Sequence, residues 1–213
     1  MKRKYLVYQF KISLRDITPP IWRRVQVPST YSFWDLHVAI QDVIGWLDYH
    51  LHVFRLKRPR AKKIFEIGIP PHDYFEDEPE VLPGWEEFIA DYFDEPGKLA
   101  DYEYDFGDCW EHEILFEGIL LREKGKKYPA CLAGERACPP EDCGGAHGYQ
   151  DFVEIMKNPL HQEHQRMVEW CGKKFDSEAF SHSEVRFDNP KKRWEYAFIE
   201  APAKMAERLK KIS

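Results

Sequence analysis

The stretch from Trp110 to Leu121 alternates large apolar residues with glutamates, and this alternation constrains the fold more than any other feature of the sequence. Successive side chains of a β-strand point to opposite faces, so the pattern predicts a strand with one buried face and one polar face. The stretch from Leu6 to Leu14 alternates in the same way. Two such strands predict a sheet with one face covered by other elements.

The N-terminal part of the chain predicts two further strands around a helix. Residues 21–27 predict a second strand, and the Pro-Pro pair before them predicts a turn, because proline fixes φ and lacks an N–H donor. Ser32 begins a capping box, and apolar residues from Phe33 to Leu47 follow at helical spacing. Residues 51–56 predict a third strand, so the chain opens β-β-α-β.

Helices are predicted for the C-terminal third. Residues 149–156 and 160–171 have helical patterns on either side of an Asn-Pro pair. Asn189 and the proline after it have the form of a helix cap and a first-turn proline. A third helix is therefore predicted to run from there toward Lys211.

No linker divides the chain, so we predict one domain over residues 1–213. Its core spans about residues 5–171, and a helical extension spans about residues 175–213. The predicted class is α+β, with a β-β-α-β opening, a mainly antiparallel sheet, helices on one face and a helical C-terminal third. Two segments rich in turn-forming residues, 73–83 and 129–148, are predicted as loops.

The formal net charge is −6, but the charges are segregated along the chain. Between Glu66 and Glu117 the single basic residue is Lys98, whereas the rest of the chain has a basic excess.

The composition excludes a membrane span, a coiled coil and a repeat array. The N-terminal stretch lacks the apolar run of a signal peptide, so we expect a cytoplasmic protein without a membrane partner. Five cysteines, an odd number, argue against a disulfide framework.

Two segments carry motifs more distinctive than these patterns, residues 102–113 (YEYDFGDCWEHE) and residues 131–149, which begin CLAGERACPPEDCGG. Together with residues 20–24 (PIWRR) and 50–54 (HLHVF), they resemble the plasmid pRiA4b ORF-3-like family, which includes a passenger protein of a bacterial insertion element. The resemblance covers roughly residues 5–171. It implies an α+β fold and occurrence on plasmids, mobile elements and chromosomes, and it implies no established activity.

Three cysteines, Cys131, Cys138 and Cys143, lie close together in the second motif. Thiolates bind zinc tetrahedrally, and a structural zinc site usually has four Cys or His ligands. The fourth ligand would be His147 or His112. One alternative is that the three cysteines are reduced and pack as small hydrophobic residues. Another is a disulfide between Cys131 and Cys138, which the expected cytoplasmic compartment disfavours.

The first motif places Asp105 and Asp108 at the end of a predicted strand, and His112 follows on the next strand. These side chains predict a carboxylate–histidine site for a divalent metal or for acid–base chemistry. The alternative is a turn whose aspartates accept backbone hydrogen bonds, beside a histidine of the core.

The second motif adds Glu141 and Asp142, followed by Gly144, Gly145 and Tyr149, as candidates for ligand binding. The two glycines permit positive φ and close approach of the backbone to a ligand. Acidic neighbours repel phosphate, so this is not a phosphate-binding loop. The alternative is the entry of a helix, where acidic residues complement the helix dipole.

His50 and His52 are two residues apart on a predicted strand, so they are expected to share one face. Such a pair chelates a metal with one further ligand. The alternative is polar packing at a strand edge.

A basic run lies between the third predicted strand and the acidic window. Clustered Lys and Arg are the feature expected for binding the phosphates of nucleic acid. The alternatives are a solvated face and pairing with the acidic window, within the chain or between chains. The nucleic-acid candidates are Arg55, Lys57, Arg58, Arg60, Lys62 and Lys63.

The sequence favours an accessory or binding module of mobile-element type, whose loop cluster binds a ligand or a structural metal such as zinc. One alternative is a metal-dependent hydrolase acting on phosphodiesters, in which Asp105, Asp108, Glu141 and His112 hold a cation that activates water. Another is a nucleic-acid-binding protein. No common catalytic motif is present, so the sequence leaves open whether the chain is an enzyme or a homo-oligomer.

Overall fold

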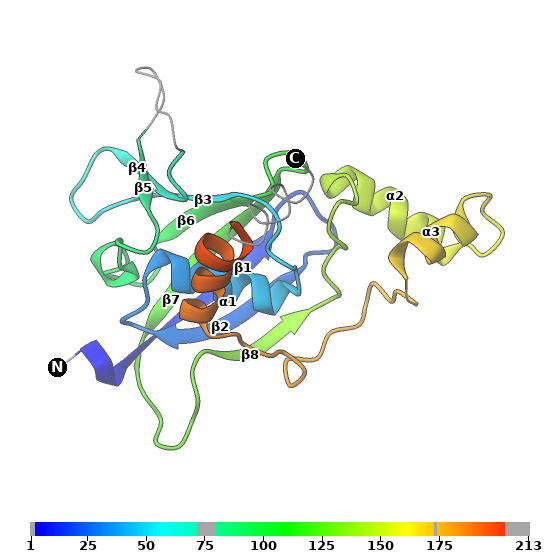
Figure 1. The fold of residues 1–213 in the computed structure, drawn as a ribbon. Helices are drawn as coiled ribbons and strands as arrows, with labels where there is room; N and C mark the ends of the chain where they lie inside the picture. The colour runs from blue at the N-terminus through cyan, green and yellow to red at the C-terminus, as the bar shows by residue number, and fades with distance from the viewer. Residues whose placement is uncertain (1–2, 72–79, 173, 203–213) are drawn as a thin grey trace.

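A sheet of eight strands forms the body of the computed structural model, which describes residues 3–71, 80–172 and 174–202 (Figure 1). The strands are β1 (Leu6–Leu14), β2 (Trp22–Pro28), β3 (His52–Lys57), β4 (Ile64–Gly68), β5 (Val81–Pro83), β6 (Leu99–Tyr104), β7 (Trp110–Leu121) and β8 (Ala130–Glu135). The helices are α1 (Phe33–Ile44), α2 (Gly145–Lys157), α3 (His164–Cys171) and α4 (Pro190–Glu195), with the shorter η1 (Arg3–Tyr5), η2 (Ile89–Asp91) and π-helical η3 (Tyr196–Glu200). The predicted α+β class is confirmed.

The strand order across the sheet is β5-β4-β3-β6-β7-β1-β2-β8. Neighbouring strands are antiparallel except β4 and β5, which run parallel. The strands with the clearest alternation, β1 and β7, pair with each other. β7 begins and ends at the residues that the alternation predicts, Trp110 and Leu121. The same alternation places Ile114 and Phe116 in the core.

Helix α1 covers the apolar face of the sheet, and its ends follow from local sequence. The Ser32 hydroxyl accepts a hydrogen bond from the Asp35 backbone N–H, and the Asp35 carboxylate accepts one from the Ser32 N–H, so the predicted capping box is present. Gly45 ends the helix at φ 93°, a left-handed conformation that glycine adopts without steric cost. The helix packs Phe33, Leu36 and Ile40 into the core.

Arg23 of β2 ties the sheet to α1 and to the segments that follow β8. Its buried guanidinium donates hydrogen bonds to the carbonyl oxygens of Trp22, Val43, Glu135 and Arg136 and to Sγ of Cys138. The ring of Phe180 covers it, with the guanidinium carbon 3.7 Å from the ring centroid. A buried charge is tolerated only when its hydrogen bonds are satisfied, as they are here.

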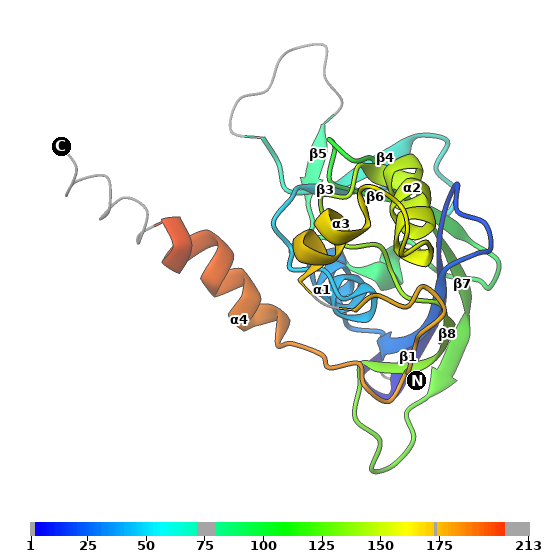
Figure 2. The ribbon, with the colours of Figure 1, turned by 90° about the vertical axis from the view of Figure 1, so that its right-hand side faces the viewer.

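Helix α4 forms an outer layer against α1, so that Figure 2 shows the sheet, α1 and α4 in that order. The predicted Asn189 cap is confirmed, because its side chain accepts hydrogen bonds from the N–H groups of residues 191 and 192. Helical structure continues through residue 202. The remainder of the predicted helix, residues 203–213, lies outside the described residues.

Three strands are absent from the sequence-based expectation. β8 lies inside the segment 129–148 that was expected to be a loop, because an edge strand pairs on one side only and carries a weak pattern. β5 lies inside the segment 73–83, of which residues 73–79 are outside the described part of the chain. β4 was not expected. None of the helices in the described ranges is long and apolar enough to cross a membrane.

Candidate metal centre

Three loops lie at one end of the sheet, as the strand register requires. The His50 loop (residues 45–51) joins α1 to β3, the Asp105 turn (residues 105–109) joins β6 to β7, and the Asp142 loop (residues 136–144) joins β8 to α2. The first residue of β3 pairs with the last of β6, which pairs with the first of β7. The end of β8 is brought to the same side through β2 and β1.

The side chains of His50, Asp105 and Asp142 converge where these loops meet. One ligand atom from each lies within 4.8 Å of the other two. Nε2 of His50 is 3.1 Å from Oδ1 of Asp142 and 3.6 Å from Oδ2 of Asp105. Across the described ranges, this is the one group of three or more His, Cys, Asp or Glu side chains with such spacing.

The Nε2 atom of His50 is buried and has no hydrogen-bond partner among the described residues, although two carboxylates face it. Carboxylate oxygens repel the lone pair of a neutral imidazole unless a proton or a cation lies between them. The arrangement is therefore balanced by a proton on Nε2 of His50 or by a bound cation. Three converging donors leave further coordination positions open, which is typical of catalytic metal sites.

The backbone holds both carboxylates in an uncommon conformation. Asp105 has φ 58° and Asp142 has φ 57°, in the left-handed region that residues other than glycine seldom adopt. Such conformations cluster at functional sites. The Asp105 side chain is also fixed, because its Oδ1 accepts a hydrogen bond from the Gly107 N–H at 2.9 Å. Its own N–H donates to the Leu51 carbonyl at 2.9 Å, which joins the Asp105 turn to the His50 loop.

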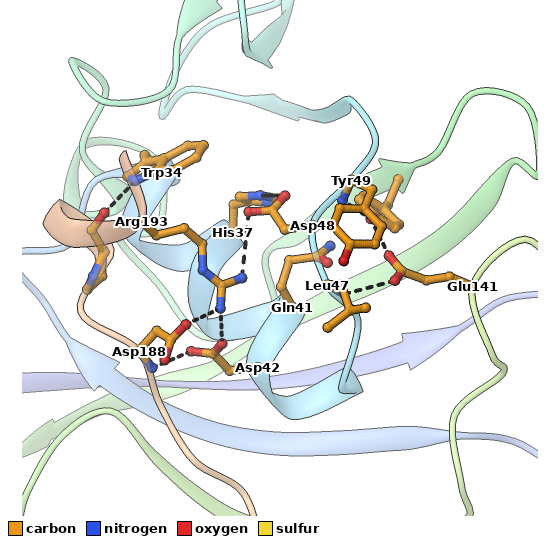
Figure 3. Close-up of polar contacts among 12 residues, drawn as sticks. Trp34, His37, Gln41, Asp42, Leu47, Asp48, Tyr49, Glu141, Asp188 and Arg193 are labelled. Atoms are coloured by element: carbon orange, nitrogen blue, oxygen red, sulfur yellow. Dashed lines mark hydrogen bonds and ion pairs between the residues drawn. The ribbon is translucent and has the colours of Figure 1, made fainter. Parts of the chain in front are cut away.

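Glu141 fastens the Asp142 loop to the His50 loop. Its Oε1 accepts a hydrogen bond from the Tyr104 hydroxyl at 2.6 Å, and its Oε2 accepts one from the Leu47 N–H at 3.0 Å (Figure 3). The Tyr104 oxygen accepts in turn from the Tyr49 N–H at 3.0 Å. Burial, together with Glu141, raises the pKa of Tyr104, so the hydroxyl remains a donor at neutral pH.

Asp48 fastens the opposite side of the His50 loop. Its carboxylate accepts a hydrogen bond from Nε2 of His37 at 2.8 Å and lies 3.6 Å from the Arg193 guanidinium of α4 (Figure 3). Arg193 also pairs with Asp42 at 2.8 Å and with Asp188 at 2.5 Å. The His50 loop is therefore held between α1 and α4 on one side and the Asp142 loop on the other.

The other sequence candidates near this end of the sheet have positioning contacts. Oδ2 of Asp108 accepts a hydrogen bond from the Gly144 N–H at 3.0 Å. Gly145 has φ 68°, and a Cβ at this position would lie 2.4 Å from the Asp108 carbonyl oxygen, so glycine is required for this approach. Tyr149 is buried, and its hydroxyl lies 3.3 Å from the Ala137 carbonyl.

His112 does not join the cluster, in contrast to the expected convergence with Asp105, Asp108 and Glu141. It is fully buried, and its Nδ1 faces the carbonyls of Tyr102 and Trp110. Burial lowers its pKa to about 4, so it is neutral at neutral pH. The reason is the pleat, which directs position 112 into the core.

The predicted cysteine site is not assembled either. Among the described residues, Cys131, Cys138 and Cys143 do not share a site with one another, with His147 or with His112. β8 separates the first cysteine from the others, and Sγ of Cys138 accepts a hydrogen bond from Arg23 at 2.9 Å. Burial raises the pKa of Cys138 to about 11 and of Cys143 to about 12, which favours reduced, protonated thiols.

His50 is the residue that the sequence patterns placed in the wrong context. β3 begins at His52, so His50 lies in the loop and the two histidines do not face the same way. His52 instead stacks on His37 in the core, with ring centroids 3.5 Å apart. The motif HLHVF marked both histidines, but the partners of His50 come from distant loops.

The basic run pairs in part with the acidic window, one of the expected alternatives. Arg55 contacts Glu66 at 2.8 Å and Glu103 at 2.6 Å, and Arg58 pairs with Glu87. The remaining candidates, Lys57, Arg60, Lys62 and Lys63, are exposed. A cavity of about 600 Å³ beside them is lined by both signs of charge, including Lys98, Asp94 and Asp101.

A second cavity, of about 420 Å³, opens between α2 and α3 and includes Asp142 in its wall. Phe152, Ile155, Met167 and Trp170 supply apolar and aromatic surface. The cluster and this cavity therefore share one carboxylate. An open coordination position beside an apolar cavity is a common arrangement for binding a small molecule.

Comparisons with known proteins agree with this fold. A sequence profile described as plasmid pRiA4b ORF-3-like protein matches residues 6–184. The uncharacterized protein y4hQ of Sinorhizobium fredii (strain NBRC 101917 / NGR234) is 34% identical over 181 residues, which are 84% of this chain and 88% of that protein. The crystal structure of MM3350, a protein of unknown function from Methanosarcina mazei Go1, is 41% identical with a TM-score of 0.78 and covers 85% of this chain and 98% of its own. None of these descriptions names an activity.

Proposed function

The chain belongs to the plasmid pRiA4b ORF-3-like family, and because its relatives bring no established activity, we propose from geometry that it binds a divalent metal ion through His50, Asp105 and Asp142. The observation that carries the proposal is the buried Nε2 of His50, which faces two carboxylates without a hydrogen bond to either. One nitrogen and two oxygen ligands suit a first-row ion such as Mn²⁺, Fe²⁺ or Zn²⁺. The metal supplies a Lewis acid with open positions for water or a ligand.

Isothermal titration of the full-length protein with MnCl₂ and with ZnCl₂ tests the proposal. We expect saturable binding of one ion, weakened at least tenfold by His50→Gln and by Asp105→Asn. Asparagine tolerates the left-handed backbone at position 105, so the second substitution removes charge with little added strain. His147→Gln is the matched control, since His147 is an exposed histidine on α2 outside the cluster. The absence of saturable binding, or equal affinity in His50→Gln, would refute the proposal.

Metal-dependent hydrolysis is a second candidate, because three protein ligands leave a position for water. The cavity that shares Asp142 favours a substrate with an apolar part over a bare phosphodiester, since Arg166 is the one cation among the described residues that line it. The Mn²⁺-loaded protein should then cleave an aryl ester faster than bis(p-nitrophenyl) phosphate. Equal rates for the wild type and Asp105→Asn on both substrates would exclude this role.

The cellular setting belongs to the same proposal. The five cysteines are all unpaired, which supports a cytoplasmic location. The plasmid name of the family supports an accessory role in a mobile element. A purified protein that retains its metal through gel filtration would support the site.

A further inference from the structure

We infer that helix α4 positions the His50 loop for metal binding, through the ion pair between Arg193 and Asp48; this inference rests on the metal site proposed above. Asp48 precedes the ligand His50 by two residues in the same loop. Its carboxylate is 3.6 Å from the Arg193 guanidinium, and both side chains are mostly buried. Arg193 is therefore a positioning residue, which acts on the site without touching the metal.

The contacts fix three consecutive residues immediately before His50. The N–H groups of Leu47 and Tyr49 donate to Glu141 and Tyr104, which hold the loop from the side of Asp142. Between them, Asp48 has φ 63° and directs its carboxylate to the opposite side, toward His37 and Arg193. The strained backbone of Asp48 is thus retained by contacts on α1 and α4.

Helix α4 is itself firmly attached to the domain. The Trp34 Nε1–H donates to the Pro190 carbonyl at 3.0 Å, and the Asp42 carboxylate on α1 accepts from Arg193 at 2.8 Å. The ring of Phe198, just after α4, packs on Trp34 with centroids 5.5 Å apart. These contacts place the Arg193 guanidinium between α1 and the His50 loop (Figure 3).

Arg193 and the helix α4 lie outside the region that the family profile matches, which ends at residue 184. The three ligands lie inside that region. The chain therefore adds, after the shared domain, a helix that contacts the loop carrying one ligand. A loop already held in its binding conformation loses less conformational entropy on binding, so affinity rises without a new metal contact.

Arg193→Gln in the full-length protein tests the inference. Titration with ZnCl₂ should show about tenfold weaker binding, and a chelator should remove the metal faster, because the loop opens more often. Lys191→Gln is the matched control, since Lys191 is an exposed cation on the same helix and pairs with Glu195. We expect it to bind zinc within twofold of the wild type.

Two further variants separate positioning from general stability. Arg193→Lys should recover part of the affinity, because it restores a cation beside Asp48. Asp48→Asn should weaken binding as well, and combining it with Arg193→Gln should add little, because both remove one contact. If Arg193→Gln does not fold, Asp48→Asn alone gives the answer.

Wild-type affinity in both Arg193→Gln and Asp48→Asn would overturn this inference and leave the proposed metal site intact. Fully additive losses in the double variant would also overturn it, since independent effects do not pass through one contact. A wild-type protein that binds neither Mn²⁺ nor Zn²⁺ would instead refute the proposed function.

Discussion

Two clusters of carboxylates lie on either side of the His50 loop, and they differ in the source of their cation. Around Arg193, the side chains of Asp42, Asp48 and Asp188 surround a guanidinium that the chain itself supplies. Around His50, two carboxylates face an imidazole nitrogen to which they make no hydrogen bond. In the first cluster the cation belongs to the chain and donates to Asp42 and Asp188, although its Nη1 lies 3.6 Å from Asp48 without a hydrogen bond. The second cluster is balanced by a proton on Nε2 or by an added ion.

The difference shows why a group of acidic residues is weak evidence of a site. Buried carboxylates are common in structural ion pairs, where an arginine neutralises them. A ligand site is marked instead by metal-ligating side chains that converge where the chain supplies no cation to neutralise them.

The Arg193 cluster should respond most strongly to loss of its cation. Arg193→Gln leaves the mostly buried Asp42 and Asp48 without a counter-charge, so we expect a loss of about 3 kcal/mol in the free energy of unfolding. Urea unfolding at pH 7 measures it. Lys191→Gln, an exposed change on the same helix, should cost less than about 0.5 kcal/mol. Equal losses would show that the Arg193 cluster is not a buried ion-pair network.

The His50 cluster should respond to an added ion. At a free metal concentration of one hundred times Kd, binding stabilises the folded state by about 2.7 kcal/mol. We expect Zn²⁺ to raise the urea midpoint of the wild type, EDTA to reverse the change, and Asp105→Asn to abolish it. An equal rise in Asp105→Asn would place the metal elsewhere on the protein.

The two clusters should also differ in acid. Burial raises the pKa of Asp42 from its ordinary 3.8 to about 6, despite Arg193 beside it. The folded state therefore binds this proton more tightly than the unfolded state, and protonation stabilises the fold as pH falls from about 6 toward 4. Relative to Asp42→Asn, the wild type should gain about 1–2 kcal/mol over this window.

Comparing the stability of the wild type with that of Asp42→Asn separates the effect of Asp42 protonation from the effect of the buried histidines. Burial lowers the pKa values of His52 and His112, so both destabilise the fold as pH falls below about 6.5, in the wild type and the variant alike. Urea unfolding at half-unit steps of pH supplies the comparison. A stability difference that does not change with pH would contradict the raised pKa of Asp42.

Asp142→Asn should have the smallest effect in the absence of metal. The carboxylate is 66% exposed and its ion pair in the described structure is with His50, so we expect a change within about 0.5 kcal/mol. A loss above about 1.5 kcal/mol would mean that a protonated His50 already pairs tightly with Asp142. The His50 cluster would then resemble the Arg193 cluster, and the contrast between the two would fail.

Local sequence patterns predict the strands and helices whose formation depends on nearby residues. β7 follows from its alternation, and α1 follows from the Ser32 capping box and the glycine that ends it. β8 was missed because its sequence, ACLAGE, has no β-branched residue and pairs with β2 alone. The predicted zinc site lies in the same segment, but Cys131 belongs to β8 and joins no group of three metal-ligating side chains among the described residues.

Two of the three cluster residues, Asp105 and Asp142, were candidates from the sequence. The sequence pattern groups His50 with His52 on one strand, whereas β3 begins at His52 and leaves His50 in the loop before it. Which loops meet depends on strand order and register across the sheet, and the sequence pattern does not specify the order β3-β6-β7. That Asp105 and Asp142 face His50 is therefore known only from the three-dimensional structure.

The wide separation of the three ligands along the chain has a consequence for folding. His50, Asp105 and Asp142 are brought together only after β3, β6 and β7 have paired and β8 has joined β2. Contacts between distant segments form late, because closing the long loops between them costs chain entropy. An ion held by all three would accordingly bind neither a fragment nor a partly folded chain tightly. Release of such an ion would therefore indicate that this whole end of the sheet has opened, and not that a single loop has unfolded locally.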